Sequence, residues 1–214
     1  IFPFLTPDAL SIIAIIGAIT ALMAAITAIT RNDIKAVLAY STISQLGYMI
    51  MALGVGAHLY AFFHLVTHAM FKACLFLCSG SVIHAMHHSL HHLDDHHTNP
   101  QDMNNMGGFK NKMPITYATM LISTLAISGV PMFSGFLSKD GILAGTLSYY
   151  NMNHGWTIIL PLAGFGAAMI TAFYMFRLIF KTFHGKPKNK KIFNHIHESP
   201  LPMTIPLILL SILS

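Results

Sequence analysis

Charged side chains are scarce in this sequence of 214 residues, and acidic ones are the scarcest. Only 9% of the residues are charged, with seven aspartates and glutamates in total, whereas 54% are hydrophobic and the mean hydropathy is +0.62. This composition excludes an ordinary soluble domain and indicates a protein of the lipid bilayer. The net charge of +5 does not indicate a nucleic-acid partner, because the positions of positive charges matter more than their sum in a membrane protein.

Cysteine is nearly absent, and the nucleotide-binding motif GxGxxG is absent altogether. An iron–sulfur cluster needs about four protein ligands, and the sequence has only Cys74 and Cys78. These two lie four residues apart in an apolar segment, so we expect small buried side chains and infer no redox compartment from them. The sequence therefore contains neither the ligands of an iron–sulfur cluster nor the fingerprint of a dinucleotide site.

Long apolar segments dominate what is present. A hydrocarbon core about 30 Å thick takes roughly 20 helical residues to cross. Six segments are candidates: residues 9–30, 36–55, 57–83, 114–150, 155–183 and from 200 onward. We predict an all-α, polytopic membrane protein with about six transmembrane segments. The chain begins at Ile1 and stops within an apolar run at Ser214, so we expect an internal piece of a longer polypeptide.

The fourth segment is too long for one straight crossing, since residues 114–150 would measure about 55 Å as a helix. The sequence SGVPMFSG, Ser128 to Gly135, supplies a place to break it. Pro131 removes a backbone donor and clashes with the preceding turn, while Gly129 and Gly135 tolerate unusual dihedrals. We predict one broken helix near Ser128–Gly135.

If each predicted segment crosses the membrane, successive loops lie on alternate sides of it, and the lysines and arginines of the loops then all fall on one side. The opposite side, residues 1–8, 54–58 and 147–154, has none. By the positive-inside rule the basic side faces the cytoplasm or the mitochondrial matrix. The basic residues on that side are Arg31, Lys35, Lys110, Lys112, Lys181, Lys186, Lys188, Lys190 and Lys191, with Arg177 just inside its edge. Lys72 and Lys139 alone remain at membrane depth.

Three titratable residues lie four apart inside the third segment: His64, His68 and Lys72. At 3.6 residues per turn this spacing keeps them nearly on one helical face. Because an ionisable side chain in hydrocarbon costs on the order of 3 kcal/mol, we expect them to face protein or water. Histidine titrates near neutral pH, so His64 and His68 are candidates for passing protons to Lys72.

Lys139 and Asp140 follow directly after the predicted break. Irregular backbone at membrane depth is tolerated only where it lies in protein or lines a watery cavity, so we expect a channel-lining site for proton transfer. Two structural alternatives remain open for this pair. Lys139 and Asp140 form an ion pair, or Lys139 reaches the membrane surface.

Alternatives also remain for the histidines. His64 and His68 can serve only to hold helices together by hydrogen bonds. They also resemble half of a zinc site, although no glutamate follows His64 as in a zincin.

A second histidine-rich segment, HAMHHSLHHLDDHH, has a composition that can bind transition metals. Its spacing equally fits a solvated helical extension of the third segment, which is the interpretation we favour.

Four stretches carry a specific resemblance to a known family: NDIKAVLAYSTISQLGY (residues 32–48), HLVTHAMFKACLFLCSGSVIH (64–84), QDMNNMGG (101–108) and SGVPMFSGFLSKDGIL (128–143). They resemble the antiporter-like, proton-pumping subunits of respiratory NADH:quinone oxidoreductase, complex I, in particular chain L of bacteria or subunit 5 of mitochondria. The resemblance covers essentially the whole chain. It implies that residues 1–199 form the second antiporter-like helical repeat region of the membrane arm, with a His-rich loop at 84–113 and a basic loop at 184–199. Residues 200–214 would start a truncated C-terminal transmembrane helix.

The resemblance also assigns roles by matching position. Lys72 resembles the central lysine of the family's second half-channel, and His64 and His68 resemble the residues that bridge toward it. Lys139 corresponds to the lysine of proton exit, with Asp140 as its acidic neighbour. No cofactor is implied on this chain, because FMN, iron–sulfur clusters and quinone are expected on partner subunits.

The implied function is proton translocation coupled to quinone reduction elsewhere in the complex, a translocase role without electron transfer on this chain. The implied partners are protons, the lipid bilayer and other membrane-arm subunits, in a bacterial inner membrane or the mitochondrial inner membrane. The alternatives are a subunit of an Mrp-type Na⁺/H⁺ antiporter or of a membrane-bound hydrogenase, a passive scaffold, and a metal carrier that uses the histidine-rich segment.

Overall fold

Most of the described chain, residues 6–214 of the computed structural model, is helical, and that part contains no β-strand. The prediction of an all-α protein is confirmed. The α-helices are α1 (Pro7–Thr30), α2 (Ile34–Gly54), α3 (His58–His92), α4 (Pro114–Ser128), α5 (Ser134–Asn153), α6 (Ile159–Phe183), α7 (Lys190–His195) and α8 (Leu201–Ile212). Three short 3₁₀ turns join them: η2 (Met103–Asn105), η3 (Phe109–Asn111) and η4 (Gly155–Ile158).

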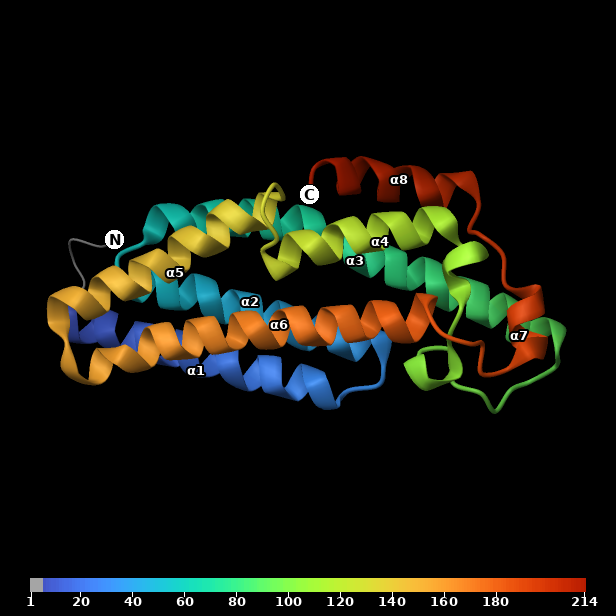
Figure 1. Cartoon of the computed structure of the whole chain (residues 1–214), viewed down its shortest axis with the longest axis horizontal. Helices are drawn as coiled ribbons and strands as arrows, with labels where there is room; N and C mark the ends of the chain where they lie inside the picture. Colours follow the sequence, from blue (N-terminus) through green and yellow to red (C-terminus); the bar gives the residue numbers. More distant parts are fainter. Residues whose placement is uncertain (1–5) are drawn as a thin grey trace.

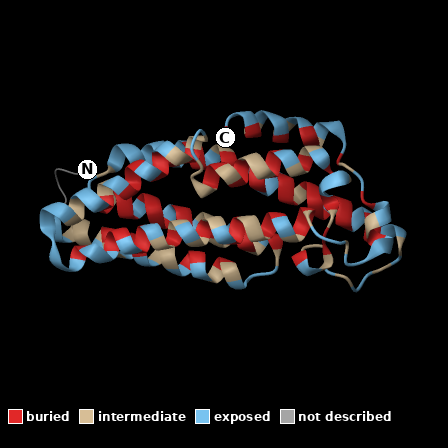
Figure 2. Cartoon of the chain, in the orientation of Figure 1, coloured by how far each residue is buried: buried red, intermediate tan, exposed pale blue. Residues whose placement is uncertain are grey.

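The long helices run lengthwise beside one another, and the chain reverses direction from each to the next except between α4 and α5 (Figure 1). Helices α4 and α5 follow one another along the molecule, so together they make a single crossing, and α8 lies beside α4. Within the described residues, α1, α2, α3 and the stretch Gly155–Phe183 are long and apolar enough to cross a membrane. The broken pair and the shorter apolar α8 correspond to the other two predicted segments. Buried residues face inward between the helices, and the outward faces are exposed (Figure 2).

Helices α1 and α2 pack at very close range because both present small residues to each other. Ala14 and Ala21 of α1 are buried, as is Gly47 of α2. A Cβ atom added at Gly47 would meet the backbone of Ala21, and one added at Gly54 would meet the backbone of Ala14. These contacts hold the two backbones together with no side chain between them, which is the way membrane helices commonly associate.

The predicted break is confirmed at its predicted place. Helix α4 ends at Ser128, and Gly129 then takes a left-handed conformation with φ of 77°. The Gly129 N–H bonds the Ala126 carbonyl at 3.1 Å and the Val130 N–H bonds the Leu125 carbonyl at 3.1 Å, the pattern of a Schellman C-cap. Gly135 has a different role from the predicted one: it is helical, and a Cβ atom there would clash with the Ala126 carbonyl. Its small size allows α5 to begin against the end of α4.

Two carboxylates cap helices at the end of the molecule where α7 lies. Asp33 accepts the backbone N–H of Lys35 at 2.7 Å and of Ala36 at 3.0 Å, at the start of α2. Glu198 accepts the backbone N–H of Ile115 at 2.8 Å and the Thr116 hydroxyl at 2.6 Å, at the start of α4. The links between α1 and α2, after α3 and between α6 and α7 all lie toward this end (Figure 1), so the basic loops share one side as predicted.

The histidine-rich segment is helical for its first part. Helix α3 continues to His92, so the loop begins at Leu93 and not at residue 84. Met86 and Leu90 stay buried on the inner face, while all seven histidines from His84 to His97 are exposed, which confirms the solvated helical extension. After the helix, hydrogen bonds from the Thr98 hydroxyl and two backbone N–H groups lower the pKa of the Asp95 carboxyl.

Candidate proton-transfer site

A row of buried polar side chains occupies the interior between α2, α3 and the broken pair α4–α5. Polar groups are expensive in a membrane interior, so each needs a hydrogen-bond partner or a functional reason. The row contains Gln45, His64, Thr67, His68, Lys72, Ser138 and Lys139, all of them buried. The sequence-predicted residues His64, His68, Lys72 and Lys139 are therefore brought to the same interior.

His64 is held on both of its ring nitrogens by residues of other helices. Its Nδ1 lies 2.8 Å from the Ser138 hydroxyl of α5, and its Nε2 lies 3.0 Å from the Gln45 Oε1 of α2. The amide oxygen can only accept, so Nε2 donates, and in a neutral ring Nδ1 then accepts from Ser138. Thr67 lies 3.2 Å from the same Ser138 hydroxyl, which extends the network along α3.

His68 follows on the same face of α3 but makes no hydrogen bond to His64. The two ring centroids are 6.0 Å apart and tilted by 40°, and the His68 ring packs edge-on against Phe71 at 5.4 Å. The His68 Nε2 is buried without a partner among residues 6–214, and the same is true of the Gln45 Nε2. Orphaned buried nitrogens of this kind are satisfied by water or by rotation of a neighbour. A step from His64 to His68 requires one of these.

Lys72 is 5% exposed and donates to the Leu38 carbonyl of α2 at 2.9 Å. Its ammonium also lies 5.7 Å from the centre of the Phe76 ring. In the described part of the chain no carboxylate comes within ion-pair distance of it. Lys72 is thus held by neutral groups only, and its charge is not fixed by a counter-ion.

Lys139 lies at the start of α5, directly after the break. It is 3% exposed, and its Nζ donates to the Ile127 carbonyl at 3.1 Å. Carbonyls in the last turn of a helix have no partner within the helix, so the end of α4 creates this acceptor. The Lys139 ammonium also lies 5.3 Å from the centre of the Tyr48 ring, and the Tyr48 hydroxyl donates to the Gly164 carbonyl of α6. The broken helix therefore supplies the binding site of this lysine.

Asp140 is not part of this interior. Its side chain is exposed, and across residues 6–214 the single ion pair joins His96 and Asp94. Both structural alternatives for Lys139 are wrong, because it neither pairs with Asp140 nor reaches the surface. Successive residues of a helix point about 100° apart, so a carboxylate next in sequence does not share the face of the lysine.

Sequence reasoning missed the hydroxyl groups that position the histidine. Ser138 precedes Lys139 in SGFLSKDGIL and is fully buried, yet a single serine in a helix carries no distinct signal. Gln45 lies in the second predicted segment, where a single amide likewise carries no distinct signal.

The two cysteines are buried as predicted, with their sulfur atoms 4.0 Å apart and not joined by a disulfide. Among the described residues, no three His, Cys, Asp or Glu side chains are grouped to hold a metal ion.

Comparison with known proteins sets this site in a family. The family described as "NADH:quinone oxidoreductase/Mrp antiporter, TM" matches residues 1–171, which is most of the chain. The chain belongs to this family. It is accordingly a multi-pass membrane protein, in agreement with its apolar helices.

Relatives of high similarity are subunits of NADH–quinone oxidoreductases. The chain is 44% identical over 225 residues to NADH-quinone oxidoreductase subunit L of Neisseria meningitidis, covering 97% of this chain and 31% of that protein. It is 46% identical over 211 residues to NADH-ubiquinone oxidoreductase chain 5 of Allomyces macrogynus, covering 98% of this chain and 31% of that protein. The chain thus spans about a third of the length of these relatives.

A solved structure shows the same arrangement of helices. The membrane-bound sulfane sulfur reductase, an archaeal respiratory membrane complex, contains a chain that matches with a TM-score of 0.81 at 29% identity. The match covers 97% of this chain and 32% of that one. This part of the fold therefore recurs in respiratory membrane complexes that differ in the substrate they reduce.

Proposed function

We propose that this chain moves protons across an energy-transducing membrane as part of a membrane-arm subunit of NADH:quinone oxidoreductase. The observation that carries the proposal is a row of four buried ionisable side chains, His64, His68, Lys72 and Lys139, without a carboxylate partner in the described chain. Charges that only stabilised the fold would be neutralised by opposite charges. Groups held by carbonyls and hydroxyls remain able to gain and lose a proton.

The sequence predicted that His64 and His68 pass protons to Lys72, which then connects to Lys139. Because His64, and not Lys72, is hydrogen-bonded to α5, we propose the opposite order along α3, from Lys72 through His68 and His64 to the break. His64 is hydrogen-bonded to the Ser138 hydroxyl, which brings the route to α5, the helix that also carries Lys139. Proton transfer between His68 and His64 becomes possible when the unpaired Nε2 of His68 gains a hydrogen-bond partner. Asp140 is exposed and makes no ion pair with Lys139, so it lies outside the proposed route.

Electron transfer belongs elsewhere in the proposed complex. FMN, iron–sulfur clusters and quinone would lie on partner subunits, and this chain would contribute only proton transfer. Its partners would be other membrane-arm subunits and the lipid bilayer, in a bacterial inner membrane or the mitochondrial inner membrane. The relatives named NADH-quinone oxidoreductase subunit L and chain 5 support this assignment.

The Lys72→Ala variant, in the full subunit and the intact complex, separates this proposal from a passive scaffold. We expect normal assembly with proton uptake per assembled complex reduced at least about tenfold, because proton transfer by a positioned side chain is worth that much or more. The measurement is pH-indicator quenching in proteoliposomes during NADH oxidation. Loss of assembly with unchanged uptake in the complexes that remain would favour the scaffold.

Transport by an Mrp-type antiporter or a membrane-bound hydrogenase subunit is the second candidate, because the matching family description includes the Mrp antiporter. Varying Na⁺ at fixed pH in the same proteoliposomes distinguishes the two. Our proposal predicts uptake that is independent of Na⁺, and a strict Na⁺ requirement would contradict it. Deleting residues 86–97 tests the metal carrier, which predicts altered metal content.

A further inference from the structure

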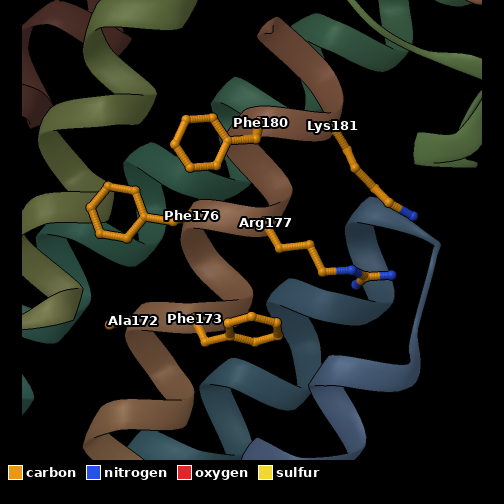
Figure 3. Close-up of a pocket in the computed structure, with 6 residues that line it drawn as sticks. All are labelled: Ala172, Phe173, Phe176, Arg177, Phe180 and Lys181. Atoms are coloured by element: carbon orange, nitrogen blue, oxygen red, sulfur yellow. The ribbon is translucent and has the colours of Figure 1, made fainter. Parts of the chain in front are cut away.

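An amphiphilic groove runs along the outer face of α6, near the end that carries the basic loops (Figure 3). It has a volume of about 480 Å³. Phe173, Phe176 and Phe180 supply its apolar wall, and Arg177 and Lys181 supply two cations. Phe173 and Phe180 are 59% and 57% exposed, so this part of the helix is not covered by the described chain.

The residues form two stripes at helical spacing. Phe173, Arg177 and Lys181 lie four residues apart, as do Phe176 and Phe180, whose rings stack at 6.3 Å. In Figure 3 the two cations point toward the link between α1 and α2, while Phe176 and Phe180 point to the other side of the helix. With a rise of about 1.5 Å per residue, the cations follow Phe173 by about 6 and 12 Å. Phe176 and Phe180 therefore lie level with Arg177 and Lys181 on the other side of the helix, and Phe173 extends the apolar surface about one turn deeper.

Neutral oxygens fix both cations in place. Arg177 donates to the Arg31 carbonyl at 2.9 Å and to the Asn32 Oδ1 at 2.6 Å. Lys181 donates to the same Asn32 oxygen at 3.2 Å and to the Asn104 Oδ1 at 2.8 Å. Neither forms an ion pair with a described carboxylate. The two side chains are preorganised by neutral groups, and the carboxylate of Asp102, whose charge acts on Lys181, is not within ion-pair distance.

From this arrangement we propose that the groove binds an anionic phospholipid, with its phosphate on Arg177 and Lys181 and an acyl chain along Phe173, Phe176 and Phe180. The occupant needs an anion and an apolar chain in one molecule, because the cations and the aromatic wall are continuous. A phospholipid supplies both, and its phosphate lies at the membrane edge, where these cations lie. By the positive-inside rule this edge faces the leaflet in which anionic lipids attract basic residues.

The test uses the intact complex that contains the full subunit, stripped of lipid by detergent. Phosphatidylglycerol is then titrated in and the bound lipid is counted by native mass spectrometry, with phosphatidylcholine as the neutral comparison. The double variant Arg177→Gln/Lys181→Gln is compared with Lys190→Gln/Lys191→Gln, which removes the same charge from exposed lysines of α7. We expect about fivefold weaker phosphatidylglycerol binding for each groove cation removed and no change in the control.

Phe180→Ala is the second variant, because it leaves the hydrogen bonds of both cations intact and does not endanger folding. It should weaken phosphatidylglycerol binding by several-fold. Soluble glycerol phosphate is a further arm of the experiment, and it should fail to displace the lipid. Displacement by glycerol phosphate would indicate a free-phosphate site, and equal binding by wild type and the double variant would indicate that other parts of the polypeptide cover the groove. Either result overturns the proposal.

Discussion

His64 depends on two neighbours that come from different helices. Ser138 of α5 and Gln45 of α2 occupy both ring nitrogens, so the orientation of the ring is set by the packing of three helices. This arrangement also fits the structural alternative, in which the histidine only holds helices together. The two hypotheses predict different proton uptake when one hydrogen-bond partner of His64 is removed and the packing of the helices is kept.

Ser138→Ala makes that difference measurable. Loss of the hydroxyl removes the donor to the His64 Nδ1 and with it the contact of His64 with α5, at a stability cost of about 1–3 kcal/mol for the buried group left unsatisfied. If His64 passes protons, we expect proton uptake per assembled complex to fall at least about tenfold, measured by indicator quenching. A role in packing alone predicts a lower melting temperature and unchanged uptake.

Ser89→Ala serves as the matched control for this substitution. Ser89 is also a buried serine of the helix bundle, and its hydroxyl has no partner in the part of the chain that the structure describes. Its removal should leave both assembly and proton uptake unchanged. A comparable loss of uptake in both variants would mean that Ser138 has no special place in the route.

The sequence was sufficient to predict that the three titratable residues of α3 share one face, but not which residues of other helices they contact. A repeat of four places His64, His68 and Lys72 on one face of a helix whatever the rest of the fold. The contact with Ser138 joins residues 74 positions apart, and nothing local in the sequence encodes it. Adjacency in sequence was misleading for Asp140, because the next residue of a helix points away from the face of Lys139.

At the scale of elements, α1 and α2 pack closely because their small residues leave no side chain between the two backbones. Gly47→Val would place methyl groups where the backbone of Ala21 lies, so the two helices have to separate. We expect destabilisation of about 1–3 kcal/mol or more, since backbone atoms cannot give way as a flexible side chain can. A thermal melt of the purified full subunit in detergent measures it.

Gly80→Ala is the opposite case on α3. A Cβ atom at Gly80 meets nothing within 4 Å, so the substitution adds helix propensity without a clash. It should raise stability by about 0.5–1 kcal/mol. Destabilisation by Gly80→Ala of the same size as by Gly47→Val would contradict the close packing of α1 on α2.

Glu198→Ala tests the cap of α4. The carboxylate binds the Ile115 N–H and the Thr116 hydroxyl, and it lies at the N-terminal, positive end of the helix dipole. Its loss should cost about 1 kcal/mol of stability, and Glu198→Gln should lose less because its amide oxygen still accepts. Hydrogen exchange of the first α4 amides provides the readout, and equal protection in Glu198→Ala and wild type would be incompatible with the cap.

Boundaries of elements were predictable where special residues mark them. Gly129 and Pro131 locate the break, and Pro114 starts α4 at the expected residue. The far end of α3 was ambiguous, because its exposed histidines look like a loop by composition. In the structure the helix continues to His92, and Met86 and Leu90, four residues apart, extend its buried face. The cap by Glu198, which is 83 residues from Ile115, has no local signal in the sequence.

At the scale of the whole molecule, the two ends differ in charge while the interior is polar at mid-length. The basic loops gather toward one end, and the broken helix places Lys139 in the interior (Figure 1). The described helices expose many large apolar residues on their outer faces, as expected for a chain that covers about a third of its relatives and lies in lipid. The proposed function would place lipid and partner subunits against these faces.

The proton-to-electron ratio of the intact complex carrying Lys139→Gln tests the central claim most directly. The glutamine amide is neutral and still offers hydrogen-bond donors, so a polar group is kept in the interior while the titratable amine is lost. Lys191→Gln, at an exposed position on α7, is the control. We predict normal assembly and a lower ratio for Lys139→Gln alone, and an unchanged ratio in the assembled Lys139→Gln complex would contradict proton transfer through this site.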